Sequence, residues 1–187
     1  FPAMGTLFPM LNSIDGVLDC DLAAYCPIDS TLNVDLSALS AVCSLDGKNM
    51  VLFTNETFHQ IASKLRFKDR ERNMIDHISA DFVAKNHQIE ILPFRLDMDR
   101  YSFIVGGQHS MDMSFNYHID VLKSPIPFNF GLDVNGKVGD FKYNLGKTRY
   151  TILFNRPIQH EEYRMSKQRR LDEEKVEILR EFRNVIP

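Results

Sequence analysis

Residues 111 to 122 read MDMSFNYHIDVL, and apolar and polar side chains alternate along the whole stretch. Successive side chains of a β-strand point to opposite faces of a sheet, so the alternation predicts a strand with one apolar and one polar face. The apolar face is expected to hold Met111, Met113, Phe115, Tyr117, Ile119 and Val121. The solvent face is expected to hold Asp112, Ser114, Asn116, His118 and Asp120.

The same period of two recurs along most of the chain. It predicts further strands over residues 18–26, 32–36, 41–45, 78–84, 89–98, 101–105 and 126–134. The sequences DGKN at Asp46 to Asn49 and KNHQ at Lys85 to Gln88 have the composition of turns between antiparallel strands. The apolar phase slips by one residue at Pro93, which is typical of a β-bulge at an exposed or edge-like position. The sequence therefore predicts a long antiparallel meander.

Two segments have helical spacing instead. Residues 55–68 carry apolar side chains three and four positions apart behind Thr54 and Asn55, either of which is a good N-cap. The segment from Pro157 to Ile186 is expected to be a second helix, with Pro157 in its first turn. Its seam of Leu171, Lys175, Ile178, Phe182 and Val185 has coiled-coil spacing, and Leu179 and Ile186 widen the stripe. Docking on the chain's own sheet or on a neighbouring domain is favoured over a dimer zipper, because two heptads with a lysine make a weak seam.

Composition limits the kinds of partner. The 187 residues suffice for one sizeable domain, and a net charge of -3 argues against an electrostatic grip on nucleic acid or on anionic lipid headgroups. The first residues form no signal peptide and no apolar run could cross a membrane, so we expect a piece of a larger protein. Cys20 and Cys26 are too far apart on one strand to form a disulfide. Cys43 could pair with either of them, but free buried thiols are favoured.

No catalytic constellation stands out. The chain has no phosphate-binding loop, nucleophile elbow, zinc-ligand pair or calcium loop. Asp97 and Asp99 are better explained as a solvated turn than as a carboxylate pair. His118 and Asp120 are expected to be exposed neighbours on the polar face of their strand. We therefore expect neither an enzyme nor a metal or cofactor site.

Three stretches carry a resemblance to a known family. They are GKNMVLFTNETFHQIASKLRFKDRERNMIDHISADF, NHQIEILPFRLDMDRYSFIVGG and DMSFNYHIDVLKSPIPFNFGLDVNG. Over about residues 13–150 the chain resembles the C-terminal region of the AsmA family of Gram-negative envelope proteins, in particular its Bacteroidetes-type members. The resemblance implies a protein anchored in the inner membrane, with this region at the distal, periplasmic end of a curved β-trough. It also implies a part in moving phospholipid between the inner and outer membranes and in outer-membrane homeostasis.

Together these observations predict a mostly β (α+β) fold, a long curved antiparallel meander with one inserted amphipathic helix and a C-terminal helix. Residues 1–156 are expected to form the sheet domain and residues 157–187 a helical tail. The leading function is non-enzymatic handling of phospholipid or another acyl-chain ligand on the apolar face. The candidate contacts are Phe103, Met111, Met113, Phe115, Tyr117, Ile119, Val121, Phe128 and Phe130. The alternative is a docking module for an outer-membrane or periplasmic protein partner, with a closed core and no lipid.

Overall fold

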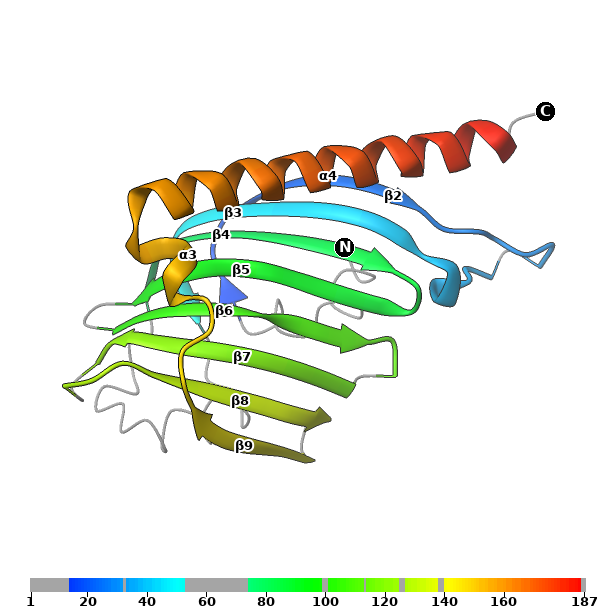
Figure 1. The fold of residues 1–187 in the computed structure, drawn as a ribbon. Coiled ribbons are helices and arrows are strands. Elements are labelled where there is room, and N and C mark those ends of the chain that lie inside the picture. The colour runs from blue at the N-terminus through cyan, green and yellow to red at the C-terminus, as the bar shows by residue number, and fades with distance from the viewer. Residues whose placement is uncertain are drawn as a thin grey trace.

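The computed structural model describes residues 14–31, 33–52, 74–98, 101–112, 114–124, 127–137 and 140–185, which fold into one sheet and its covering helices (Figure 1). The strands are β1 (Ile14–Asp15), β2 (Leu18–Tyr25), β3 (Ser40–Leu52), β4 (Met74–Lys85), β5 (Gln88–Met98), β6 (Tyr101–Ser110), β7 (Ser114–Lys123), β8 (Phe130–Lys137) and β9 (Asp140–Gly146). The helices are the 3-10 turn η2 (Leu36–Ala38), the short α3 (Thr151–Asn155) and the long α4 (Pro157–Val185). The predicted helix at 55–68 lies outside the described residues.

The sheet is an open antiparallel meander. From β3 to β9 each strand pairs with the next one along the chain, while β1 and β2 lie end to end on the free side of β3. Gly16 separates these two short strands at a positive φ of 144°. Among the described strands the sheet does not close on itself, and its two edges are β1 with β2 and β9. The predicted fold class is confirmed, including the C-terminal helix.

Two local features follow directly from the sequence. Lys85 pairs with Gln88 across a two-residue hairpin turn, in which Asn86 and His87 have φ values of 53° and 64°. Positive φ at both central residues defines the turn type that matches the twist of antiparallel strands. The phase slip at Pro93 is a β-bulge, because the register shifts between Ile91 and Phe94. The bulge lies on the interior strand β5 and not at an edge as predicted. Pro93 is tolerated there because a bulged residue needs no ladder hydrogen bond from its nitrogen.

The turn predicted at Asp46 to Asn49 is wrong, because β3 continues through it. Asn49 has a positive φ of 52°, yet the ladder to β4 keeps its register on both sides, from Lys48 opposite His77 to Met50 opposite Ile75. The continuous ladder to β4 outweighs the local turn preference of this sequence. The irregularity lies on the other side of β3. There the ladder of hydrogen bonds is interrupted between the end of β1 and the start of β2.

The strand predicted over residues 32–36 is also wrong. Ile28 and Val34 form an isolated bridge, and a 3-10 turn follows. The carboxylate of Asp29 accepts hydrogen bonds from the backbone nitrogens of Thr31 and Asn33, at 2.8 and 2.9 Å. Side-chain capping of this kind offers the backbone an alternative to a strand ladder.

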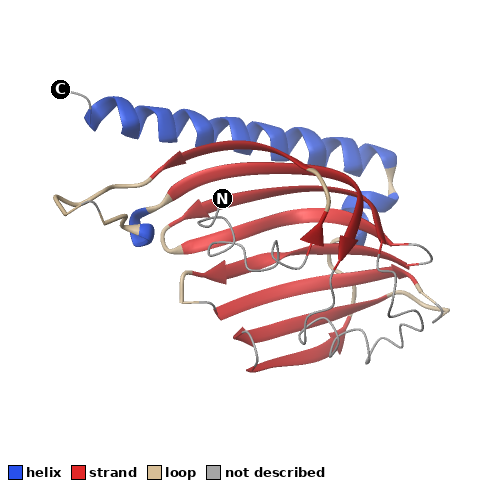
Figure 2. Cartoon of the chain, turned by 180° about the vertical axis from the view of Figure 1, so that it is seen from behind, coloured by secondary structure: helices blue, strands red, loops and turns tan. Residues whose placement is uncertain are grey.

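The sheet has two distinct faces. The apolar face carries Cys43, Phe82, Ile91, Tyr117 and Val134 in register across the strands, and it holds the larger core cluster. The opposite side, here called the helix face, is covered by α4 over β2 to β5 (Figure 1). The apolar face is the one toward the viewer in Figure 2.

The tail helix docks on the chain's own sheet, as the sequence predicted. Leu171 and Ile178 are buried against Val42, Val83 and Leu92 of the helix face. Polar contacts flank this apolar strip: Lys167 with Asp81, Arg170 with Glu90, Lys175 with Asp21, and Lys85 with Glu174 and Glu177. The predicted stripe is too wide, because Leu179 and Phe182 are exposed. A zipper through the Leu171 seam is excluded, since the sheet already occupies it.

Candidate functional site

The apolar face changes character from one side of the sheet to the other. Phe103 on β6 and Val121 on β7 are buried, whereas Phe115, Tyr117, Ile119 and Phe130 are half-buried. On the last strand Tyr143 is 41% exposed and Leu145 is 72% exposed. The candidate site is therefore the apolar face of β7 to β9, in which Leu132 and Val134 of β8 are buried. The buried Phe103 and Val121 lie beside it on the same face.

Three of the predicted contacts fall outside these strands. Met111 belongs to the turn before β7 and packs on the margin of the core, and Met113 lies outside the described residues. Phe128 lies in a bend before β8, where it is exposed and meets the ring of Phe130 edge-on at 6.2 Å. The strand predicted from residue 126 thus begins later, at Phe130.

An aromatic cluster forms the centre of the candidate site. The rings of Phe115 and Tyr117 stack at 5.3 Å, and Phe141 of β9 meets Phe115 at 6.2 Å. The Tyr117 hydroxyl lies 2.9 Å from His109 Nδ1, and burial raises the pKa of Tyr117. Opposite Tyr117 stands Gly107, at a φ of 145°, where an added Cβ would lie 2.3 Å from the Asn116 carbonyl oxygen. A glycine is therefore required where β6 and β7 approach each other beneath this cluster.

Sequence reasoning missed the contribution of β9. Phe141, Tyr143 and Leu145 alternate within DFKYNLG, which is the same period-two signal that predicts the other strands. The segment is short, and one glycine precedes it while another ends it, so its alternation is a weak signal in the sequence. These three side chains extend the apolar face to the edge of the sheet.

The polar side of β7 is not exposed as predicted. His118 is 2% exposed and Asp120 is 0% exposed, because residues 147–151 and α3 cover this part of the helix face. His118 Nε2 lies 2.8 Å from Asp120 Oδ1, and His118 Nδ1 lies 2.7 Å from Asp133 Oδ1. Arg149 Nη2 completes the group at 2.9 Å from Asp133 Oδ2. We call His118, Asp120, Asp133 and Arg149 the Asp120 cluster.

Asp120 fixes the segment that leads into α3. Its carboxylate accepts hydrogen bonds from the backbone nitrogens of Arg149, Tyr150 and Thr151, at 2.9, 2.7 and 2.7 Å, and from Thr151 Oγ1 at 2.9 Å. Gly131 permits this close approach, since a Cβ there would lie 2.3 Å from the Lys147 carbonyl oxygen. Each ring nitrogen of His118 contacts a carboxylate, Asp120 on one side and Asp133 on the other. The cluster therefore ties residues 149–151 to β7 and β8.

The start of α4 is fixed by the β5 bulge. The Tyr163 hydroxyl donates a 2.7 Å hydrogen bond to the carbonyl oxygen of Pro93, and Phe154 of α3 packs against Tyr163 at 5.6 Å. Burial is the largest of the influences that raise the pKa of Tyr163. The bulge thus gives the helix a polar attachment point on an otherwise apolar part of the sheet.

The cysteines are free thiols, as predicted, although Cys43 alone is buried. Its Sγ lies 3.5 Å from Sγ of Cys20, which is exposed on the edge strand β2. Burial, followed by the contact with Cys20, raises the pKa of Cys43 to about 12. Asp97 lies on β5 and pairs with Arg95 at 3.0 Å, while Asp99 is outside the described residues.

Comparison of the chain with protein-family models, curated proteins and solved structures finds no match. The resemblance to the AsmA family therefore stays a prediction. Among the described residues, none of the helices has the length and apolar character needed to span a membrane.

Proposed function

We propose that this chain is a non-enzymatic domain of the cell envelope that handles phospholipid by holding acyl chains against the apolar face of β7 to β9. The observation that carries the proposal is the exposure of Tyr143 and Leu145 on β9, beside the half-buried Phe115 and Phe141 on the same face. Exposed apolar side chains that gather at one edge of a folded domain commonly mark a binding surface. Together with the AsmA resemblance, the patch supports a periplasmic lipid-handling role in a protein anchored in the inner membrane.

The physical basis of such binding is transfer of hydrocarbon out of water. Burial of each methylene group contributes about 0.8 kcal/mol, so several methylenes against the patch suffice for measurable affinity. Binding through methylene groups does not require a pocket for the charged headgroup of the lipid. The half-buried rings of Phe115, Tyr117 and Phe130 offer flat apolar surface, and Tyr143 and Leu145 extend it to the sheet edge.

The test uses delipidated protein reconstituted with a phospholipid that carries a photoactivatable group in its acyl chain. Cross-links are expected on β7 to β9, and Leu145→Asp should reduce them strongly without unfolding the domain, because residue 145 is already exposed to water. Asn116→Asp is the matched control: it adds the same charge at an exposed position of the opposite face and should leave cross-linking unchanged. Equal cross-linking of the wild type and Leu145→Asp would contradict the proposal.

A second candidate function is docking of an envelope protein along β9. In the described sheet β9 pairs on one side, with β8, so its other side presents backbone donors and acceptors to a partner strand. Tyr143 and Leu145 would then contact alternate side chains of the partner. Failure of folded wild-type protein to cross-link any phospholipid would favour this reading over lipid handling.

A further inference from the structure

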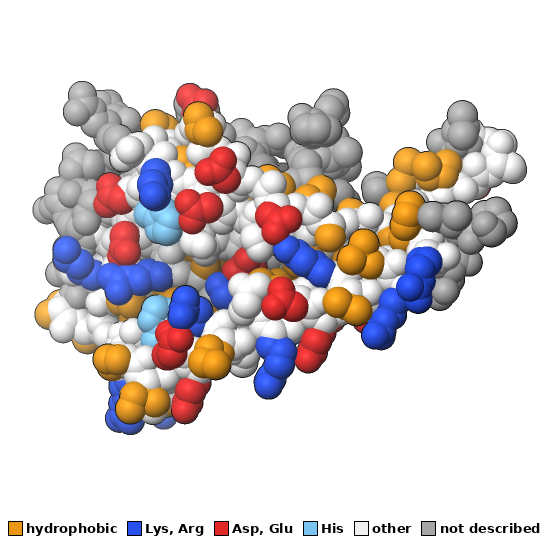
Figure 3. Space-filling model, turned by 90° about the horizontal axis from the view of Figure 1, so that it is seen from above, with side chains coloured by type: hydrophobic (Ala, Val, Ile, Leu, Met, Phe, Trp, Pro, Cys, Tyr) orange, Lys and Arg blue, Asp and Glu red, His pale blue; other side chains and the backbone are white. Residues whose placement is uncertain are grey.

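The outer surface of α4 carries apolar side chains that the sheet does not use. Met165 is 65% exposed and Val176 is 45% exposed, on the side of the helix opposite the buried Leu171 and Ile178. Figure 3, which views the molecule from the helix side, shows acidic, basic and apolar side chains mixed on this surface. Isolated apolar side chains on a charged surface are ordinary for an exposed helix, so a partner is indicated by the groove and by the placement of its charges.

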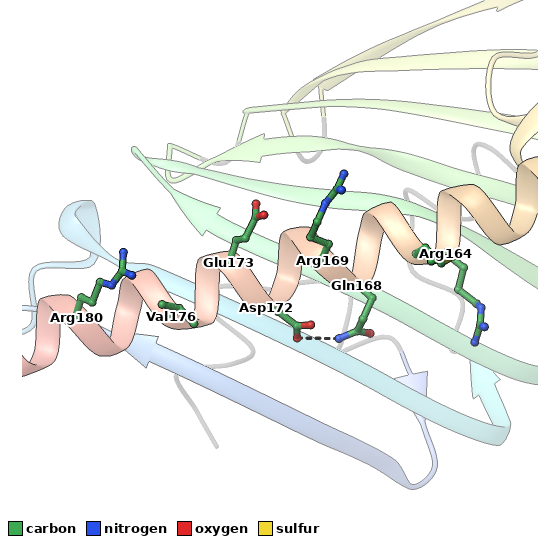
Figure 4. Close-up of a pocket in the computed structure, with 8 residues that line it drawn as sticks. Arg164, Gln168, Arg169, Asp172, Glu173, Val176 and Arg180 are labelled. Atoms are coloured by element: carbon green, nitrogen blue, oxygen red, sulfur yellow. Dashed lines mark hydrogen bonds between the residues drawn. The ribbon is translucent and has the colours of Figure 1, made fainter.

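The outer surface contains a groove of the kind into which a second helix packs (Figure 4). One wall is a row of side chains spaced four residues apart, and a parallel row forms the other wall. The first row is Arg164, Gln168, Asp172, Val176 and Arg180, and the second is Met165, Arg169 and Glu173. Rows with this spacing are the ridges and grooves by which helices interlock.

Several charges along the groove have no counterpart in their own chain. Among the described residues, none forms an ion pair or hydrogen bond with Arg169, Glu173 or Arg180, which extend away from the helix in Figure 4. Asp172 accepts a hydrogen bond from Gln168 Nε2 at 3.0 Å, and Glu161 pairs with Arg164 at 2.8 Å on the same helix. The central charges of the groove are thus available to an external partner.

The order of the charges identifies that partner. From the N-terminal end, the surface presents Glu161 paired with Arg164, then Arg169, then Asp172 and Glu173, then Arg180. In the opposite direction the same surface presents a positive charge where the forward direction presents a negative one at two places, positions 169 with 172 and positions 161 with 180. An antiparallel copy would therefore place Arg169 against Asp172 and Arg180 against Glu161, each pair formed twice. A parallel copy would place like charges together.

The apolar groups agree with this alignment. Residues 165, 169, 172 and 176 are spaced four, three and four apart, so they lie on one stripe of the helix. With Arg169 opposite Asp172 in an antiparallel pair, Met165 falls opposite Val176 of the other copy. Exposed apolar side chains would then cover each other on both sides of the central ion pairs.

We infer that a second copy of this chain docks antiparallel on the outer face of α4, through the groove between Met165 and Arg180. The contact is isologous, with the two-fold axis midway between Arg169 and Asp172, and it leaves the candidate lipid site on β7 to β9 uncovered. It is independent of the proposed function, because it uses the opposite side of the molecule.

Analytical ultracentrifugation of the chain tests the contact. Wild type should show a concentration-dependent dimer, and Arg169→Glu and Asp172→Arg should each weaken self-association about tenfold or more, because attraction becomes repulsion twice per dimer. An equimolar mixture of the two variants should regain dimer, since each new charge then faces its opposite. Lys142→Glu makes the same charge change as Arg169→Glu on an exposed position of β9 and should leave association unchanged.

A photoreactive benzoylphenylalanine at position 165 tests the orientation. It should cross-link to the second copy near Val176, and circular dichroism should confirm that each variant keeps the wild-type fold. Monomeric wild type at every accessible concentration would overturn the inference. So would dimers whose cross-links join position 165 to the same position of the other copy, or variants that associate as strongly as wild type.

Discussion

Replacing Asp120 with asparagine should destabilise the fold severely. The carboxylate is fully buried and accepts hydrogen bonds from three consecutive backbone nitrogens, the Thr151 hydroxyl and the His118 ring. An asparagine amide offers one acceptor oxygen, and its nitrogen is itself a donor. In either orientation of the amide, the donors that now face one carboxylate oxygen lose their acceptor.

The size of the effect follows from these losses. An unsatisfied buried donor costs about 1–3 kcal/mol, and removal of one partner from a buried ionic group costs about 3–5 kcal/mol. With at least two donors affected, we expect Asp120→Asn to lower the free energy of unfolding by about 3–5 kcal/mol, from a typical total of about 5–15 kcal/mol.

Urea denaturation followed by circular dichroism measures the loss, and hydrogen exchange should show faster exchange of the amides of Arg149, Tyr150 and Thr151. Asp76→Asn makes the same chemical change at an exposed position of β4 and should alter stability by less than about 0.5 kcal/mol. A loss below about 1 kcal/mol for Asp120→Asn, with protected amides, would refute the idea that the Asp120 cluster clamps the start of α3.

Three further predictions concern the helix, the thiols and the acid response. Leu171→Ala should lower the free energy of unfolding by about 2–5 kcal/mol, whereas Leu179→Ala, on the exposed side of α4, should cost little; denaturation curves of both variants check this. A maleimide at neutral pH should label Cys20 and spare Cys43, whose pKa of about 12 and burial leave almost no accessible thiolate, and mass spectrometry of native and unfolded protein would show the difference. Hydrogen bonds from Thr31 and then Asn33 lower the pKa of Asp29 from 3.8 to about 2, so the loop around it should be intact above about pH 4 and open as the pH falls toward 2; unchanged amide shifts there in an NMR titration would contradict this.

The sequence alone was sufficient wherever the determining interactions are local or periodic. The period of two places side chains on alternate faces whatever the neighbouring strand is, so the meander and its apolar face were predictable. Asn86 and His87 tolerate the positive φ that the two-residue hairpin requires, and Pro157 suits the first turn of a helix. The apolar spacing of Leu171 and Ile178 likewise identified the side of α4 that packs.

The tertiary structure decided which of the two sheet faces is covered at each point. Alternation distinguishes the faces of β7 but does not reveal that residues 149–151, about thirty positions later in the chain, bury His118 and Asp120. The ladder to β4, which keeps its register across the stretch, kept Asp46 to Asn49 within β3 although its local sequence favours a turn. The exposed end of the apolar face depends in the same way on β9 being the outermost strand of the meander. Burial is a property of contacts between distant segments, and a local pattern of side chains does not contain it.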